Sequence, residues 1–246
     1  MASSIPQFQT LITVEEFRKL VNEHFEKQIS EGQLYDARDI ERFNTIDLYT
    51  LMFIQHGQFG TSFNQEQALH VFNAAMSWRK RHNVYDISTD EFPAEYIDRQ
   101  VVYFKNNDKY HHRLLHIIIS KFNKGRENKD TVKRFLTYNF EQQVREYPGE
   151  KIVILFDMSG TGIGNLDYDL VKFLISSMQL LYPGLVAYIL LFNMPFLLSA
   201  AWKLIRTWLA SEAGQFVKYA NNKSIGDFIP PDQLPVKMGG TADDDN

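Results

Sequence analysis

The 246-residue sequence contains no cysteine, which excludes disulfide bonds and thiolate metal sites and fits a reducing compartment. It also lacks an excess of positive charge. It has 26 Lys and Arg residues against 30 Asp and Glu residues, and the net charge of −4 does not indicate nucleic-acid binding. The first residues, MASSIPQFQT, contain no basic segment followed by an apolar one, so we expect no signal peptide. Length and composition predict one large globular domain or two small ones.

Charge is missing from one long segment as well. The thirty residues from Phe173 to Trp202 contain no Asp, Glu, Lys, Arg or His, and a helix of that length would cross a bilayer. Two breaks argue against such a helix, because turn-forming residues stand at 182–184 (Tyr-Pro-Gly) and at 193–195 (Asn-Met-Pro). The apolar run 186–192 between them is typical of a buried strand. The segment therefore predicts a helix, a strand and a second helix, not a transmembrane span.

The helix expected at 196–209 is unusually apolar for a surface helix. Its charged residues are Lys203 and Arg206, so its polar face is narrow. The pattern by itself favours a core helix packed between layers. The alternative is a lid over an apolar cavity, lying at a membrane interface. The large side chains that would enter the membrane in that case are Phe196, Leu197, Trp202 and Trp208.

Helical and strand patterns divide the sequence into two parts. The first part carries helical segments, and the part after Asp86 alternates strands with helices. That alternation predicts an α/β fold with a mostly parallel sheet and helices packed against it. The expected N-terminal helices cover residues 13–30, 36–56 and 64–80. The expected strands cover 101–104, 114–119, 151–156 and 186–192, and the later helices cover 131–147, 167–181 and 196–209.

A glycine-rich loop follows the strand expected at 151–156, where phosphate-binding loops occur. Its glycines, Gly160, Gly162 and Gly164, have the spacing G-x-G-x-G and not the G-x-G-x-x-G of a dinucleotide site. The pattern thus favours a flexible strand-to-helix turn over a nucleotide-dependent enzyme. Asp157 stands where an open sheet often carries a catalytic carboxylate, but capping of the following turn is the simpler interpretation. We expect no catalytic residue.

Two clusters of side chains resemble ion-binding sites. His111, His112 and His116 have the composition of a zinc site. We interpret their segment as a polar turn followed by a strand, which does not bring all three to one helical face, and we expect no metal site. His116 is then a strand histidine that faces the core or a pocket and makes a local hydrogen bond. The basic segment 78–81 (Trp-Arg-Lys-Arg) is interpreted as the solvated end of a helix.

Four stretches, in their order and spacing, resemble the CRAL-TRIO lipid-binding family over nearly the whole chain. The segment ALHVFNAAMSWRKRHNV (68–84) is similar to the family's helical segment that ends in Trp-Arg. The segment KIVILFDMSGTGIGN (151–165) is similar to its strand followed by Asp-x-x-Gly. The segment LYPGLVAYILLFNMPFLLSAAWKLIRTWL (181–209) is similar to its Tyr-Pro, strand, Asn-x-Pro and gate helix. The segment LPVKMGG (234–240) is similar to its Leu-Pro-x-x-x-Gly-Gly.

The resemblance implies a cavity between the sheet and a gate helix, which holds a lipid or another apolar molecule without covalent chemistry and without a cofactor. It implies a lipid carrier or sensor that docks on membrane surfaces, not an enzyme. The expected divisions are an N-terminal helical subdomain (1–85), a lipid-binding domain (86–240) and an acidic linker or chain end (241–246). By strand alternation and helical spacing, the expected ligand contacts are Ile117, Ile119, Ile154, Phe156, Phe173, Ile189, Leu191, Phe196, Ala200, Trp202 and Leu204. The expected membrane contacts are Phe196, Leu197, Trp202, Lys203, Arg206 and Trp208.

Within that family the chain resembles most the N-terminal module of motile-sperm-domain-containing proteins, through YDARDIERF (35–43) and KLIRTWLASEA (203–213). This narrower resemblance implies a longer protein, anchored in the endoplasmic reticulum by a C-terminal segment beyond this chain. The module would lie on the cytoplasmic face of the membrane. A separate peptide-binding domain of that protein would bridge organelles.

The identity of the ligand is constrained by two departures from the family. Members that hold phosphatidylinositol place an acidic residue after the Tyr-Pro and a Lys soon after the gate helix. Those positions are Gly184 and Phe216 here, which argues against phosphatidylinositol. A less polar lipid, or a cavity partly filled by the protein's own aromatic side chains, is expected instead. A module that docks on a membrane or a protein with a closed cavity, and exchanges no lipid, stays open as the alternative.

Overall fold

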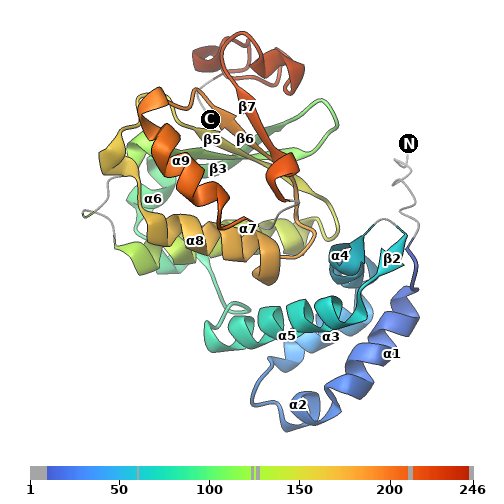
Figure 1. The fold of residues 1–246 in the computed structure, drawn as a ribbon. Coiled ribbons are helices and arrows are strands. Elements are labelled where there is room, and N and C mark those ends of the chain that lie inside the picture. Colours follow the sequence, from blue (N-terminus) through green and yellow to red (C-terminus); the bar gives the residue numbers. More distant parts are fainter. Residues whose placement is uncertain (1–9, 60, 123–124, 126–127, 210–212, 244–246) are drawn as a thin grey trace. The chain divides into compact units, whose positions relative to one another are not determined.

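The computed structural model describes residues 10–59, 61–122, 125, 128–209 and 213–243. The chain divides into two compact units (Figure 1). The first comprises Met1–Asp86 and Gln179–Gly184, and the second comprises Ile87–Met178 and Leu185–Asn246. Among the described residues, no helix has both the length and the apolar composition needed to span a bilayer.

The first unit consists of helices and a short β-hairpin. The helices expected at 13–30 and 36–56 are each divided in two, at Phe25 and at Ile46. Ile46 takes an extended backbone (φ −107°, ψ 103°), which its branched side chain favours, and Asp47 begins the next helix. The elements are α1 (Val14–His24), α2 (Glu26–Glu31), α3 (Ala37–Thr45), α4 (Asp47–Gly57), β1 (Gln58–Phe59), β2 (Ser62–Phe63) and α5 (Gln65–Arg81).

Aromatic rings and one buried ion cluster hold these helices together. The ring of Phe72 lies 4.8 Å from that of Phe43 between centroids, in an edge-to-face arrangement. Arg79 is only 1% exposed, and its Nη2 lies 2.9 Å from Oδ1 of Asp39. Nη2 of Arg42 lies 2.8 Å from the same oxygen. The interpretation of the basic segment 78–81 as a solvated helix end is therefore wrong for Arg79, because a carboxylate buried in α3 pairs with it.

The second unit contains, in its described part, a five-stranded sheet with the order β3-β4-β5-β6-β7. The pair β3 and β4 is antiparallel and the other pairs are parallel. The predicted α/β fold with a mostly parallel sheet and an N-terminal helical part is thus confirmed. The strands are β3 (Val102–Asn107), β4 (Arg113–Ile118), β5 (Ile152–Asp157), β6 (Val186–Phe192) and β7 (Val217–Ala220). The helices are α6 (Ala94–Asp98), α7 (Lys129–Glu146), α8 (Tyr168–Ser176) and α9 (Ser199–Arg206).

The long uncharged segment folds as a helix, a strand and a helix, as predicted. The strand β6 has the expected bounds, 186–192. The helix before it is α-helical to Ser176 and continues as a π-helical turn, Ser177–Leu181. The helix after it is shorter than expected, because Phe196–Leu198 form a 3₁₀ turn and α9 ends at Arg206.

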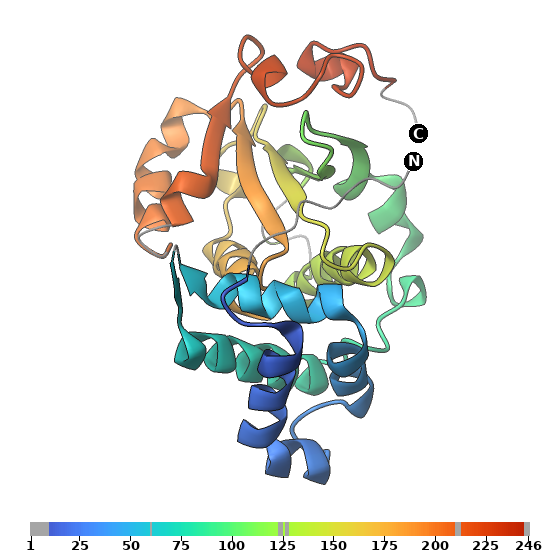
Figure 2. The ribbon, with the colours of Figure 1, turned by 90° about the vertical axis from the view of Figure 1, so that its right-hand side faces the viewer.

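The C-terminal segment covers one face of the sheet. Figures 1 and 2 show the segment in dark red, at one end of the strands. Backbone hydrogen bonds within the segment hold its fold. The N–H of Thr241 donates to Pro231 O at 2.7 Å, and the N–H of Ala242 donates to Leu234 O at 3.0 Å. A Cβ at Gly240 would overlap the carbonyl oxygen of Leu234, so only glycine fits there. The core on this side comprises Leu114, Val153, Leu155, Leu190, Phe192, Ala220, Ile225, Ile229, Leu234 and Met238.

Candidate functional site

The opposite face of the sheet presents two rows of mostly apolar side chains, which we call the apolar floor. Strand register places the members of each row side by side. The first row is Leu115, Ile154, Ile189 and Val217. The second row is Ile117, Phe156, Leu191 and Tyr219. The five strand residues that we expected to contact a ligand therefore lie on one face. They are Ile117, Ile154, Phe156, Ile189 and Leu191.

The apolar floor is covered unevenly. Ile154 in the central strand β5 is 0% exposed, so no water-sized space touches it. Phe156 and Ile189, which also lie on interior strands, are only half-buried. Large apolar side chains in the middle of a sheet are normally sealed when helices pack directly on them. The partial exposure of Phe156 and Ile189 therefore marks accessible space beside the floor.

The remaining expected ligand contacts lie outside the strands. Ile119 begins a 3₁₀ turn (Ile119–Lys121) after β4, so strand alternation does not apply to it. Phe173 on α8 is half-buried, with Nζ of Lys133 6.0 Å from its ring centroid. Trp202 on α9 is half-buried as well, whereas Phe196, Ala200 and Leu204 are exposed. Contact of all these residues with a ligand stays a prediction.

Two tryptophans, Trp202 in α9 and Trp208 two residues after its end, hold α9 against neighbouring elements. The indole N–H of Trp202 donates a hydrogen bond to the hydroxyl of Tyr219 on β7. The ring of Trp208 meets the ring of Tyr168 edge to face at 5.6 Å, and Nζ of Lys172 lies 4.9 Å from the Trp208 ring centroid. Of the expected membrane contacts, these two tryptophans thus act in this structure as anchors of α9. Their insertion into a membrane stays a prediction.

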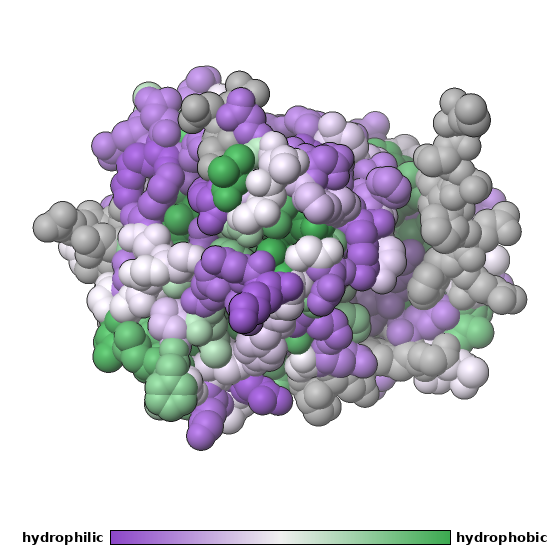
Figure 3. Space-filling view, turned by 90° about the horizontal axis from the view of Figure 1, so that it is seen from above, coloured by the Kyte–Doolittle hydropathy of each residue, from purple (hydrophilic) through white to green (hydrophobic). Residues whose placement is uncertain are grey.

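The other expected membrane contacts, together with Leu204, which was expected to contact a ligand, form what we call the exposed patch: Phe196, Leu197, Lys203, Leu204 and Arg206. Phe196 is 91% exposed, Leu197 54% and Leu204 46%. Leu204 follows Leu197 by two helical turns, so α9 extends the apolar surface of the 3₁₀ turn. Lys203 and Arg206 add exposed positive charge. Figure 3 shows one group of apolar side chains at a margin of a mostly polar face, with further apolar areas elsewhere on it.

Sequence analysis did not include two further exposed aromatic residues among the ligand or membrane contacts. Phe216 ends the 3₁₀ turn before β7, and Tyr219 lies within β7; both side chains are exposed. The four-residue strand VKYA carries two exposed positions, Lys218 and Tyr219, and too few residues to show a period. An apolar and basic surface near α9 thus includes a strand that local pattern does not reveal.

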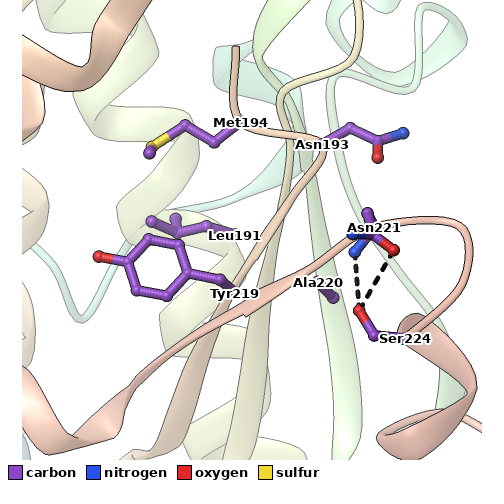
Figure 4. A pocket seen from close by; sticks show the side chains of 7 residues that line it. All are labelled: Leu191, Asn193, Met194, Tyr219, Ala220, Asn221 and Ser224. Carbon is purple, nitrogen blue, oxygen red and sulfur yellow. Dashed lines mark hydrogen bonds between the residues drawn. The ribbon is translucent and has the colours of Figure 1, made fainter. Parts of the chain in front are cut away.

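A pocket of about 400 Å³ opens at the carboxyl ends of β6 and β7 (Figure 4). Figure 4 shows the side chains of Leu191, Met194 and Tyr219 on one side of β7, and those of Asn221 and Ser224 on the other. None of the residues that line this pocket is charged. They are Leu191, Asn193, Met194, Tyr219, Ala220, Asn221 and Ser224.

Asn193 gives the pocket its shape. It has a left-handed backbone (φ 49°), which asparagine tolerates better than most residues, and its N–H donates to Ala220 O at 2.9 Å. Its Nδ2 donates to Oγ of Ser159 at 3.2 Å and to Oδ1 of Asn222 at 3.0 Å. Sequence analysis placed Asn193 in a turn and in the Asn-x-Pro of the family resemblance, but not in a binding site. Its place after a parallel strand is the signal for a site, because ligands of open sheets bind at carboxyl ends.

His111, His112 and His116 have different surroundings, and His116 is the buried strand histidine that was predicted. His116 is buried in β4, where its ring stacks on Tyr103 at 4.9 Å and its Nε2 lies 3.1 Å from Lys105 O. Nδ1 of His112 lies 3.0 Å from Oδ2 of Asp108, which also accepts a 2.9 Å hydrogen bond from the Tyr188 hydroxyl. Within the described ranges, no group of three His, Asp or Glu side chains is placed to hold a metal ion.

The glycine-rich loop is a strand-to-helix turn. Asp157 ends β5, and its Oδ1 accepts a 3.0 Å hydrogen bond from the N–H of Ser159, as predicted for a capping residue. Gly160 has a left-handed backbone (φ 68°). Asn165 closes the loop, because its Oδ1 accepts from the N–H of Gly162 at 2.9 Å.

Comparisons with known proteins relate most of the chain to one family. A family model of the CRAL/TRIO domain matches residues 98–240. A CRAL-TRIO domain-containing protein of Schizosaccharomyces pombe is 24% identical over 192 residues, 72% of this chain and 43% of that protein. The phosphatidylinositol transfer protein CSR1 of Eremothecium gossypii is 31% identical over 94 residues, 38% of this chain and 22% of that protein. The chain thus matches less than half of the length of either relative.

The fold has a counterpart among solved structures. The crystal structure of Sfh5 aligns with 95% of this chain and 87% of its own, with a TM-score of 0.68. The sequence identity between the two is 14%, so this likeness shows a common fold.

Proposed function

Because the chain belongs to the CRAL/TRIO domain family, we propose that its second unit binds an apolar molecule, most simply a lipid, between the apolar floor and α9. The observation that carries this proposal is the partial exposure of Phe156 and Ile189 on interior strands. Apolar surface in contact with water costs about 25 cal/mol per Å². A lipid chain laid on the floor removes that cost, and the floor replaces the surroundings that the chain had in a bilayer.

The exposed patch serves as the membrane contact in this proposal. Phe196 and Leu197 present apolar surface at the start of α9, and Lys203 and Arg206 stand beside it. An interfacial segment of this kind inserts its apolar side chains while its cations stay at the level of the phosphates. Docking through the same helix that covers the floor would open a path for the lipid. We therefore assign α9 the role of a gate.

The proposed ligand is not phosphatidylinositol. Gly184 has a left-handed backbone (φ 70°), and a Cβ there would lie 2.9 Å from the carbonyl oxygen of Met52. An acidic side chain does not fit at that position unless the backbone of α4 shifts. Phe216 supplies no charge at the second position. The relative CSR1 is named a phosphatidylinositol transfer protein, so the head group of the ligand has to be measured on this chain itself.

The resemblance to motile-sperm-domain-containing proteins extends the proposal to the cellular setting. In it, the module belongs to a longer protein of the endoplasmic reticulum, lies on the cytoplasmic face and acts at contacts between membranes. Imaging of the full-length protein with a marker of the endoplasmic reticulum tests this part. A distribution that does not follow the marker would contradict it.

Native mass spectrometry of the purified chain, followed by lipid extraction, tests the central proposal. We expect a defined extra mass that resolves into one lipid class, either as purified or after incubation with liposomes. A bare polypeptide mass in both conditions would contradict lipid binding. Retained binding to liposomes in that case would favour the alternative, a docking module without lipid exchange. The complete burial of Ile154 is the observation in favour of that alternative.

A further inference from the structure

The pocket at the ends of β6 and β7 is continuous with the apolar floor. Leu191 and Tyr219 line the pocket and also belong to the second row of the floor. A molecule that crosses the carboxyl ends of β6 and β7 can therefore place its polar end beside Asn221 and Ser224 and its apolar chain on the floor. Figure 4 shows this division, with Leu191 and Tyr219 on the side away from Asn221 and Ser224.

The polar half of the pocket offers both kinds of hydrogen-bonding atom. The side chain of Asn193 uses Nδ2 for Ser159 and Asn222, which leaves its Oδ1 as an acceptor. The side chain of Asn221 accepts at Oδ1 from the N–H of Lys223 at 2.9 Å, which leaves its Nδ2 as a donor. A hydroxyl group both donates and accepts, so it matches this pair of atoms.

The lining also disfavours a charged ligand. None of the lining residues is charged, so no lining side chain offers a cation to a phosphate. A phosphate brings acceptors only, and its oxygens would face Oδ1 of Asn193. The uncharged lining and the acceptor Oδ1 of Asn193 therefore disfavour anionic head groups in this pocket.

We propose that this pocket binds the polar end of a lipid whose head group is uncharged and carries a free hydroxyl, the chemical class of diacylglycerols. The inference rests on the proposed function, since the acyl chains need the apolar floor. It adds the head group, which the family alone does not specify. Asn193 and Asn221 are the residues that would set the specificity.

Competitive loading from vesicles tests the head group. The purified chain is incubated with dioleoylphosphatidylcholine vesicles that contain equal amounts of dioleoylglycerol and dioleoylphosphatidic acid. These two lipids share glycerol and acyl chains and differ in the phosphate. We expect loaded protein, measured by native mass spectrometry, to carry dioleoylglycerol in at least about tenfold excess, which corresponds to about 1.4 kcal/mol. Equal loading, or an excess of phosphatidic acid, would overturn the inference.

A matched pair of variants assigns the effect to the pocket. Asn221→Asp preserves the acceptor for Lys223 but replaces the donor with negative charge, and we expect about a tenfold loss of dioleoylglycerol loading. Gln65→Glu likewise replaces an exposed amide with a carboxylate, but in the first unit and outside the lining, and we expect loading as in the wild type. Equal loading by both variants would overturn the inference. Equal thermal unfolding temperatures exclude a general loss of fold.

The outcomes separate this inference from the proposed function. Loading of phosphatidylcholine or phosphatidic acid without dioleoylglycerol would leave the lipid-binding function standing and overturn the head-group assignment. Loading of no lipid at all, with the fold intact, would overturn both. Met194→Lys adds a cation to the lining, and we expect it to raise phosphatidic acid loading relative to the wild type.

Discussion

The indole N–H of Trp202 on α9 donates its hydrogen bond to the hydroxyl of Tyr219 on the edge strand β7. The two ring planes are nearly perpendicular, at 85°, with centroids 6.2 Å apart. The ring of Tyr219 also belongs to the apolar floor and lines the pocket. The side chain of Tyr219 thus holds α9 in place and also forms part of the surface on which we place the lipid.

Replacement of Tyr219 by phenylalanine should loosen α9. The substitution removes the acceptor for Trp202 and keeps the ring. Loss of one such hydrogen bond costs about 1 kcal/mol, or roughly a fivefold larger open population. We expect amide hydrogen exchange within α9 to accelerate by roughly that factor. Tyr110→Phe, in an exposed turn, is the control. Unchanged exchange in Tyr219→Phe would show that the bond does not hold the helix.

Phe196→Asp should weaken binding to liposomes. Its side chain is exposed, so the substitution leaves the folded core intact while it removes the largest apolar group of the exposed patch. Burial of a phenylalanine contributes about 1.5–3 kcal/mol, so the vesicle affinity should fall at least about tenfold. Val236→Asp introduces the same charge at another exposed apolar position and serves as the control in a vesicle sedimentation assay. Equal affinity of Phe196→Asp and wild type would remove Phe196 from the membrane contact.

The first unit should depend strongly on Asp39. The substitution Asp39→Asn leaves the guanidinium groups of Arg42 and Arg79 facing a neutral partner in a buried site. Removal of one member of a buried ion pair costs about 3–5 kcal/mol of unfolding free energy. Urea denaturation followed by circular dichroism measures this loss. Asp47→Asn breaks an ion pair with Arg18 in which the carboxylate is exposed, and it should cost less than about 1 kcal/mol. Similar losses in both variants would contradict the importance of burial.

His116 should make the protein sensitive to acid. Burial lowers the pKa of His116 from 6.5 to about 4, although the hydrogen bond with Lys105 O acts in the opposite direction. As the pH falls, His116 therefore binds a proton at a higher pH in the unfolded chain than in the folded chain. Stability that is present above about pH 6.5 is lost toward pH 4, by up to roughly 3 kcal/mol.

Urea denaturation between pH 7 and pH 4 measures that loss. His116→Gln keeps a side-chain donor for Lys105 O but does not titrate, so we expect a flatter dependence of stability on pH. His111→Gln changes an exposed histidine and should retain the slope of the wild type. The same slope in His116→Gln and wild type would assign the acid sensitivity to other groups.

Sequence analysis was most successful where local pattern decides the structure. The strand β6 has the predicted bounds because a continuous apolar run lies between two turns that contain proline. The helix after it was overestimated, since the apolar pattern continues past Arg206 while the helical backbone does not. The edge strand β7 was missed, because it is short and half of its side chains face solvent.

The parts that escaped prediction depend on residues distant in sequence. Arg79 is buried because α3 places Asp39 against it, and nothing in the segment 78–81 indicates that partner. The polar pocket likewise combines Asn193 after β6 with Asn221 after β7. Only the parallel register of these two strands brings both asparagines to the same edge. The apolar floor was predicted better, since strand alternation alone determines which side chains share a face.

The chain passes between the two units more than once. It contributes Gln179–Gly184 to the first unit and returns to the second at Leu185. In the first unit the ring of Tyr182 lies 6.4 Å from that of Trp78, and Gly184 packs on the backbone of Met52. A fragment that ends at residue 86 therefore lacks part of the unit to which it belongs. During synthesis on the ribosome, the first unit is completed only after residue 184 has emerged, although most of it is made first.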